Sequence, residues 1–100
     1  IQDVTFTENT ATLNGGVIDI LGTVANISGT TSFTNNSAAE HGGAIYVNYI
    51  KAKPKTETTA EVPGAYSALT VDGCTFDANN AMAGGAVSVR TGSVATFNGT

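Results

Sequence analysis

Short stretches of alternating apolar and polar residues recur in three copies along the chain. After each of three Gly-Gly pairs, two apolar positions flank one position of mixed polarity. This period of two is typical of a strand with one buried face. No window has a sustained helical period with capping residues, so we predict an all-β chain. The aligned columns are Ile18, Ile45 and Val87, then Asp19, Tyr46 and Ser88, then Ile20, Val47 and Val89.

A second set of aligned positions precedes the Gly-Gly pairs, where large and small inward positions alternate. On this alignment the last phenylalanine opens a fourth copy, which stops at Thr100. Stacking of like residues in successive copies is typical of a solenoid. The large column contains Phe6, Phe33, Phe76 and Phe97, and the small column contains Val4, Thr31, Cys74 and Ala95.

Two polar motifs separate these strands, and both have a backbone explanation. A Gly pair can turn the chain sharply because glycine tolerates positive φ. Asparagine also tolerates the left-handed region, and stacked amides can form a ladder of hydrogen bonds. The motif residues are therefore candidate binding residues for which a scaffold role is favoured. They are Phe6, Asn9, Gly15 and Gly16, then Phe33, Asn36, Gly42, Gly43, Ala44 and Ile45, then Phe76, Asn79, Gly84 and Gly85.

The spacing between copies indicates how they are connected. From the last Gly of one copy to the next Phe there are 17, 33 and 12 residues, while the motif pair itself keeps a near-constant length. A solenoid accepts insertions of this kind at one corner, because each rung contacts only its neighbours. We predict a single unit over residues 1–100, a right-handed parallel β-helix of about three rungs, with one long inserted loop at about residues 48–67.

The insertion contains both prolines, several charged residues and a Thr-rich stretch, so we expect a mobile, projecting loop. It could serve as a binding loop or as an unstructured linker, and the sequence leaves both open. The exposed candidates for contact are Tyr46, Tyr49, Lys51, Lys53 and Lys55, although Tyr46 could also pack on the loop.

Charge and composition exclude several functions. Only 12% of residues are charged and the net charge is −4, with three of the four basic residues inside the insertion. We therefore expect no nucleic-acid binding, which depends on many phosphate contacts. No apolar run approaches the ~20 residues that span a bilayer, and no signal-peptide pattern opens the chain.

Candidate chemistry is sparse. The lone Cys74 excludes an intrachain disulfide and is expected in the core, and His41 is expected to be a corner residue. Some β-helical proteins are polysaccharide lyases or hydrolases, but the acidic residues here fall in different columns apart from a near match of Asp3 and Asp72. We predict no enzymatic activity, no metal and no cofactor.

The paired motifs resemble the signature of the chlamydial polymorphic membrane proteins, Phe-x-x-Asn with Gly-Gly-Ala-Ile. The middle copy has the second motif in full, and the outer copies depart conservatively as Gly-Gly-Val-Ile and Gly-Gly-Ala-Val. The resemblance covers about 90 residues, all but the insertion. It implies a piece of a repeat-rich autotransporter passenger, whose only link to the membrane is a β-barrel elsewhere in the parent protein. It also implies a location at the bacterial outer membrane, on the cell surface or secreted.

Three functions follow, from different classes. The first is a virulence-associated adhesin segment that attaches to host cells through a host-surface protein receptor. The second is a structural spacer, or a segment that self-associates into a homo-oligomer through the unpaired strand edges at the ends of the solenoid. The third is a carbohydrate-active β-helix fragment.

Overall fold

In the computed structural model, which describes residues 1–90 and 92–100, the chain is all-β and its sheets are parallel. Short strands are separated by tight turns and corners, because Thr, Val and Ile favour extended backbone while Gly and Asn allow abrupt changes of direction. The strands are β1 (Thr5–Thr7), β2 (Thr10–Ala11), β3 (Ile18–Leu21), β4 (Val24–Ile27), β5 (Ser32–Thr34), β6 (Ser37–Ala38), β7 (Ile45–Asn48), β8 (Ala68–Asp72), β9 (Thr75–Asp77), β10 (Val87–Val89) and β11 (Val94–Asn98).

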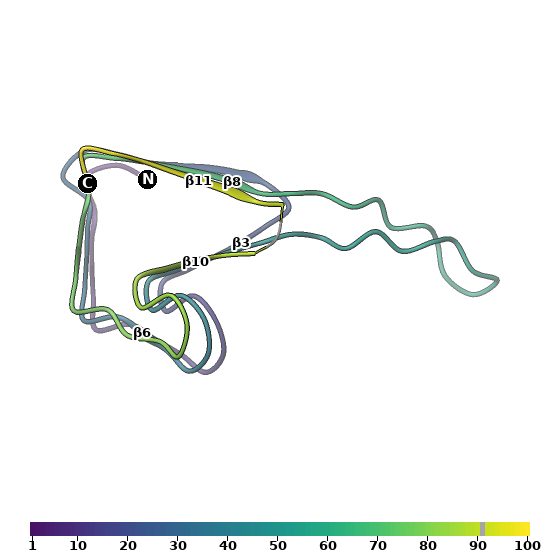
Figure 1. Cartoon of the computed structure of the whole chain (residues 1–100), viewed down its shortest axis with the longest axis horizontal. Helices are drawn as coiled ribbons and strands as arrows, with labels where there is room; N and C mark the ends of the chain where they lie inside the picture. The colour runs from purple at the N-terminus through teal and green to yellow at the C-terminus, as the bar shows by residue number, and fades with distance from the viewer. Residues whose placement is uncertain (91) are drawn as a thin grey trace.

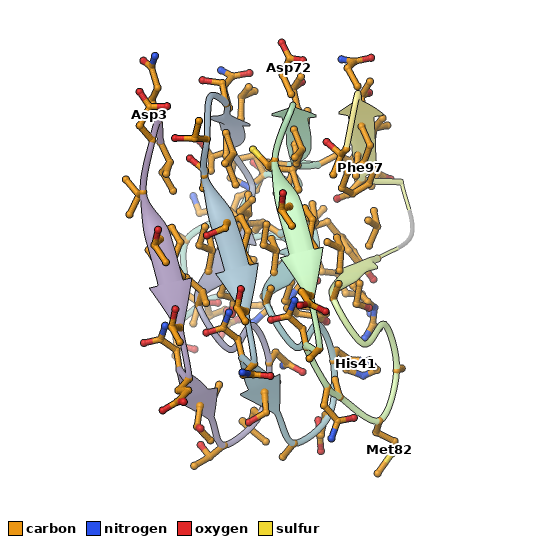
Figure 2. All side chains as sticks on the ribbon, turned by 90° about the vertical axis from the view of Figure 1, so that its left-hand side faces the viewer. Asp3, His41, Asp72, Met82 and Phe97 are labelled. Carbon is orange, nitrogen blue, oxygen red and sulfur yellow. The ribbon has the colours of Figure 1, made fainter. Side chains whose placement is uncertain are left out.

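Equivalent strands of successive repeats lie side by side. The sheets have the orders β1-β5-β9, β3-β7-β10, β4-β8-β11 and β2-β6, so each larger sheet takes one strand from each repeat. Figure 1 shows the repeats superposed, with the β4-β8-β11 sheet along the top, and Figure 2 shows them side by side. The chain therefore coils, as the sequence predicted.

The register that follows the Gly-Gly pairs is confirmed. Ile45 pairs with Ile18 on one side and with Val87 on the other, and Val47 pairs likewise with Ile20 and Val89. Ile45 and Val47 are fully buried, since each has a neighbouring repeat on both sides.

Three of the four phenylalanines also stack as predicted. Phe33 is fully buried, with ring centroids 5.1 Å from Phe6 and 4.7 Å from Phe76, both nearly coplanar. Val4, Thr31 and Cys74 occupy one column beside them, where the Val4 backbone N–H donates to Thr31 Oγ1. Thr31 and Cys74 are buried in the core.

The prediction that Phe97 and Ala95 continue these columns is wrong. Both lie in β11, which pairs with β8 and brings Phe97 opposite Val71. Phe97 is 45% exposed and meets Phe76 edge-on rather than in the stack. It therefore belongs to the third sheet, and no fourth Phe-x-x-Asn copy begins there.

The turns differ from prediction in detail. In the Phe-x-x-Asn motif the left-handed residue is the one before the Asn, namely Glu8, Asn35 and Ala78. In each Gly-Gly pair only the first glycine has positive φ. A further turn had not been recognised in the sequence: Gly29 and Gly73, which follow Ser28 and Asp72, have positive φ before the Phe strand, and Gly99 has the same conformation after Asn98.

Candidate functional site

The recurring asparagines of the repeats form a ladder of hydrogen bonds between repeats, not an open surface. The side chain of Asn36 is fully buried between two repeats. Its Oδ1 accepts hydrogen bonds from the Asn9 backbone N–H and Nδ2 at 2.9 and 3.0 Å. Its Nδ2 donates to Asn79 Oδ1 at 3.0 Å and to the Phe6 carbonyl at 3.1 Å. These amides bind one repeat to the next.

The second glycine of the first two pairs allows the repeats to approach closely. A Cβ on Gly16 would lie 2.0 Å from the carbonyl oxygen of Gly43, and one on Gly43 would lie 2.0 Å from that of Gly85. Real Cβ atoms do not approach so closely, so only glycine fits between stacked repeats. All four residues of the middle Gly-Gly-Ala-Ile motif are buried. In this chain they have no free side-chain surface to offer a partner.

Tyr46 was expected to be exposed and to pack, if anywhere, on the insertion, and the structure contradicts this. The side chain is only 3% exposed. It lies on the opposite face of β7 from the core, where its ring stacks on His41 with centroids 5.6 Å apart. Arg90 Nη1 donates to its hydroxyl at 3.2 Å. The corner that contains His41 thus covers the outer face of β7, and Tyr46 belongs to a small second core.

The insertion between β7 and β8 is an antiparallel hairpin, which we call the hairpin arm (residues 49–67). Ile50 and Ala65 exchange backbone hydrogen bonds at 2.7 and 3.0 Å, and Lys53 and Val62 do so at 2.8 and 2.9 Å. At the tip the Thr56 N–H donates to the Thr59 carbonyl. Figure 1 shows the arm extending far from the stacked repeats. Backbone pairing over this length shows a defined hairpin rather than an unstructured linker.

The root of the arm is fixed between the equivalent turns of the other repeats. A Cβ on Gly22, in the β3–β4 turn, would meet the Ile50 side chain at 2.5 Å. A Cβ on Gly92, in the corresponding turn of the third repeat, would meet the Tyr66 ring at 2.2 Å. The arm therefore begins as a packed part of the solenoid and becomes free farther out.

An aromatic pair and a cavity lie at this root. Tyr49 is half-buried, whereas Tyr66 is 67% exposed, and their ring centroids are 6.0 Å apart at a 35° tilt. The cavity has a volume of about 310 Å³ and is lined by residues 49–52 of one strand and 64–66 of the other. Lys51, Lys53 and Lys55 are all exposed on the first strand of the arm. Tyr66 had not been singled out in the sequence, although it lies just before β8 and Tyr49 lies just after β7.

The remaining reactive side chains are dispersed. Cys74 is a buried free thiol whose Sγ donates to the Asp72 carbonyl at 3.6 Å, and burial raises its pKa. Asp19 also has a raised pKa because of partial burial. Asp3 lies one column away from Asp72 and accepts a hydrogen bond from the Thr30 backbone N–H (Figure 2). Over residues 1–90 and 92–100, no three His, Cys, Asp or Glu side chains gather as metal ligands would.

Comparison with known proteins gives a match to one family. Residues 3–20 and 30–48 each match the Chlamydia polymorphic membrane protein repeat. No curated protein and no solved structure is significantly similar to the chain. In the part of the chain that the structure describes, no helix is long and apolar enough to cross a membrane. The matched segments are the first two Phe-x-x-Asn and Gly-Gly pairs with their strands, so two of the three repeats in this chain are similar to the chlamydial polymorphic membrane protein repeat.

Proposed function

We propose that this chain is an adhesive segment of a chlamydial outer-membrane autotransporter, exposed at the cell surface. The repeat is that of an outer-membrane surface family, which supports this location. We further propose that its coil is a right-handed parallel β-helix of about three rungs. The partner is a protein receptor on the host cell, and the hairpin arm makes the contact.

The observation that carries the proposal is the contrast between the repeats and the arm. The middle motif residues are buried and committed to inter-repeat contacts. The arm instead projects, exposes Tyr66 and three lysines, and is held at its root by neighbouring turns. Exposed tyrosines on a rigid support are typical anchors of protein interfaces.

A short replacement of the arm tests this proposal. In the variant, residues 49–66 are replaced by a single Gly, so that Asn48 is joined to Ser67 through one residue. The first repeat has the same turn, in which Gly22 alone lies between Leu21 and Thr23. The Thr23 N–H donates to Ser67 Oγ, so the two residues are equivalent across the stack. We expect an unchanged circular dichroism spectrum and loss of attachment of the purified chain to host cells. Full attachment by the folded variant would overturn the role of the arm.

A second candidate is self-association of the repeats. At one end of the ladder the backbone N–H of Asn79 and one N–H of its Nδ2 have no partner among the described residues, while the other N–H of Nδ2 donates to the Phe33 carbonyl. At the other end the Oδ1 of Asn9 has no such partner, because each Asn donates toward the following repeat. These ends are complementary, so one copy could stack on another. Sedimentation at increasing concentration tests it: a monomer at all concentrations argues against self-association.

A further inference from the structure

The cavity at the root of the hairpin arm has the features of an anchor pocket. Its lining consists of the two tyrosines, the small or aliphatic residues Ile50, Ala52, Gly64 and Ala65, and Lys51. Such a lining favours an apolar group, and burial of that group against aromatic rings contributes most at interface anchors. Since the rings are tilted and one of them is largely exposed, the pocket opens to solvent.

Three residues of this lining also have unpaired backbone donors. Among the described residues, the N–H groups of Lys51, Ala52 and Gly64 have no hydrogen-bond partner. The neighbouring Ile50 and Ala65 are hydrogen-bonded to each other. Unpaired amides beside an extended strand can bind the carbonyl oxygens of an added peptide segment. The pocket thus offers contacts to a peptide backbone as well as to a side chain.

Charge distinguishes the arm from the rest of the chain. Three lysines against two glutamates give the arm a net charge of +1, whereas Arg90 against six carboxylates gives the remainder −5, together the −4 of the whole chain. Lys51 lines the pocket itself, and Lys53 and Lys55 follow on the same strand. An acidic segment would be attracted to this strand while the acidic stack repels it elsewhere.

We propose that the pocket at the root of the arm binds an extended acidic segment of a protein, with one large apolar side chain packed against the two tyrosine rings and carboxylates at the lysines. The inference rests on the proposed function, because it names the chemistry of the receptor segment that the arm contacts. Tyr49 and Tyr66 supply the anchor and Lys51 supplies charge.

A direct titration tests it with defined peptides. The probe is a capped Asp-Glu-Phe-Glu-Asp peptide, added to the ¹⁵N-labelled whole chain, with an Ala-centred peptide and a Lys-Arg-Phe-Arg-Lys peptide as controls. We expect amide shifts confined to residues 49–52 and 64–66 with the acidic Phe peptide. Tyr66→Ala should weaken binding about tenfold, as loss of an aromatic anchor does. Lys51→Gln should weaken it less and reduce its dependence on salt.

The matched control is Met82→Ala, which removes an exposed apolar side chain from a distant corner (Figure 2). It should leave the titration unchanged. Equal binding of the Ala-centred or basic peptide, shifts outside the pocket, or no shift at about 5 mM peptide, where affinities are already weak, would overturn the inference.

Cell attachment separates this inference from the proposed function. If the arm replacement abolishes attachment but Tyr66→Ala does not, the pocket inference is overturned and the role of the arm stands. If the acidic peptide binds the pocket but the arm replacement attaches normally, the pocket stands and the proposed function fails.

Discussion

At the scale of single residues, Asn36 shows how this chain uses a polar side chain as a core residue. The side chain accepts from one repeat and donates to both neighbours, so every hydrogen-bonding position that faces the protein is used. A fully buried amide is tolerated only when it is satisfied in this way. The motif asparagine is thus a scaffold residue that links repeats.

Removing that side chain should be costly. In Asn36→Ala, the donors of Asn9 and the Oδ1 of Asn79 lose a buried partner, so we expect a loss of about 2–4 kcal/mol in the free energy of unfolding. Urea unfolding followed by circular dichroism measures it. Asn98→Ala is the control, because Asn98 is exposed and its side chain forms no hydrogen bond among the described residues. A midpoint equal to that of the parent chain would contradict the ladder as a source of stability.

The glycines give a second residue-scale prediction with an internal control. Gly43 does not have positive φ, so its substitution is limited by space alone: a Cβ would lie 2.5 Å from Asn80 N as well as against Gly85 O. Gly43→Ala should therefore destabilise the chain by about 1–3 kcal/mol, as overpacking does. For Gly85→Ala the nearest atom, Asn79 O, would be 3.4 Å away, and we expect little change. Similar losses for both variants would show that close approach is not the cause.

At the scale of the elements, the hairpin arm and the strands of the stack differ in what holds them. Strands β3, β7 and β10 are paired in register and covered on at least one face. The arm beyond its root has only its own partner strand, and residues 51–64 are exposed throughout. Segments with few buried contacts open more readily than packed strands.

Limited trypsin digestion should report this difference. We expect the first cut after Lys51 or Lys55, because Lys53 precedes Pro54 and is a poor site. Arg90 should be cut later, since its backbone N–H donates to the Val47 carbonyl and its side chain is bound to Tyr46. Mass spectrometry of the earliest fragments identifies the site. Initial cleavage after Arg90 would contradict the prediction.

At the scale of the whole molecule, stability is shared among repeats that touch only their neighbours. The core is contributed mainly by strands β7 and β8 of the middle repeat, in which Ile45, Val47, Leu69 and Val71 are almost fully buried. The outer repeats cover it, and apolar residues at their open ends are more exposed, as at Val89, which is 41% exposed although its partner Val47 in the same column is fully buried. Opening of an outer repeat therefore exposes the core.

Cys74 provides a probe of that opening. Burial raises the pKa of its thiol, so the folded state favours the protonated form and holds less of the reactive thiolate at a given pH. The buried protonated thiol therefore contributes to the free energy of unfolding in full at pH values below the ordinary thiol pKa. That contribution is lost as the pH rises through the raised pKa of the folded state. Alkylation by iodoacetamide at pH 8 should be slow in buffer and fast in urea. Fast alkylation of the folded chain would show that the core opens around Cys74.

How much could be foreseen depended on whether a feature was local and repeated. The Ile18, Ile45 and Val87 column and the Phe6, Phe33 and Phe76 stack followed from alternation and spacing, because each repeat imposes the same φ requirements on its turns. Phe97 was predicted in the wrong column because its aromatic side chain matches the Phe column, whereas the Asn98-Gly99 turn that follows it matches the Ser28-Gly29 and Asp72-Gly73 turns at the end of the third sheet. The recurring Ser-Gly, Asp-Gly and Asn-Gly pairs carried the signal that would have corrected it.

The candidate site was predicted only in part. The insertion and its lysines were recognisable from charge and proline, but Tyr66 lies far from Tyr49 in the sequence, and only antiparallel pairing of the arm brings the two rings together. Tyr46 was predicted to be exposed because its outward position in β7 is a local property that the alternation shows. The His41 corner that covers this position comes from another part of the chain and was not predicted. Alternation along a strand is a local property of the backbone, so the sequence by itself determined the coiled repeats and their inward columns. Which outward side chains stay free depends on contacts between distant segments, and these only the tertiary structure decided: the His41 corner buries Tyr46, and the arm leaves Tyr66 exposed.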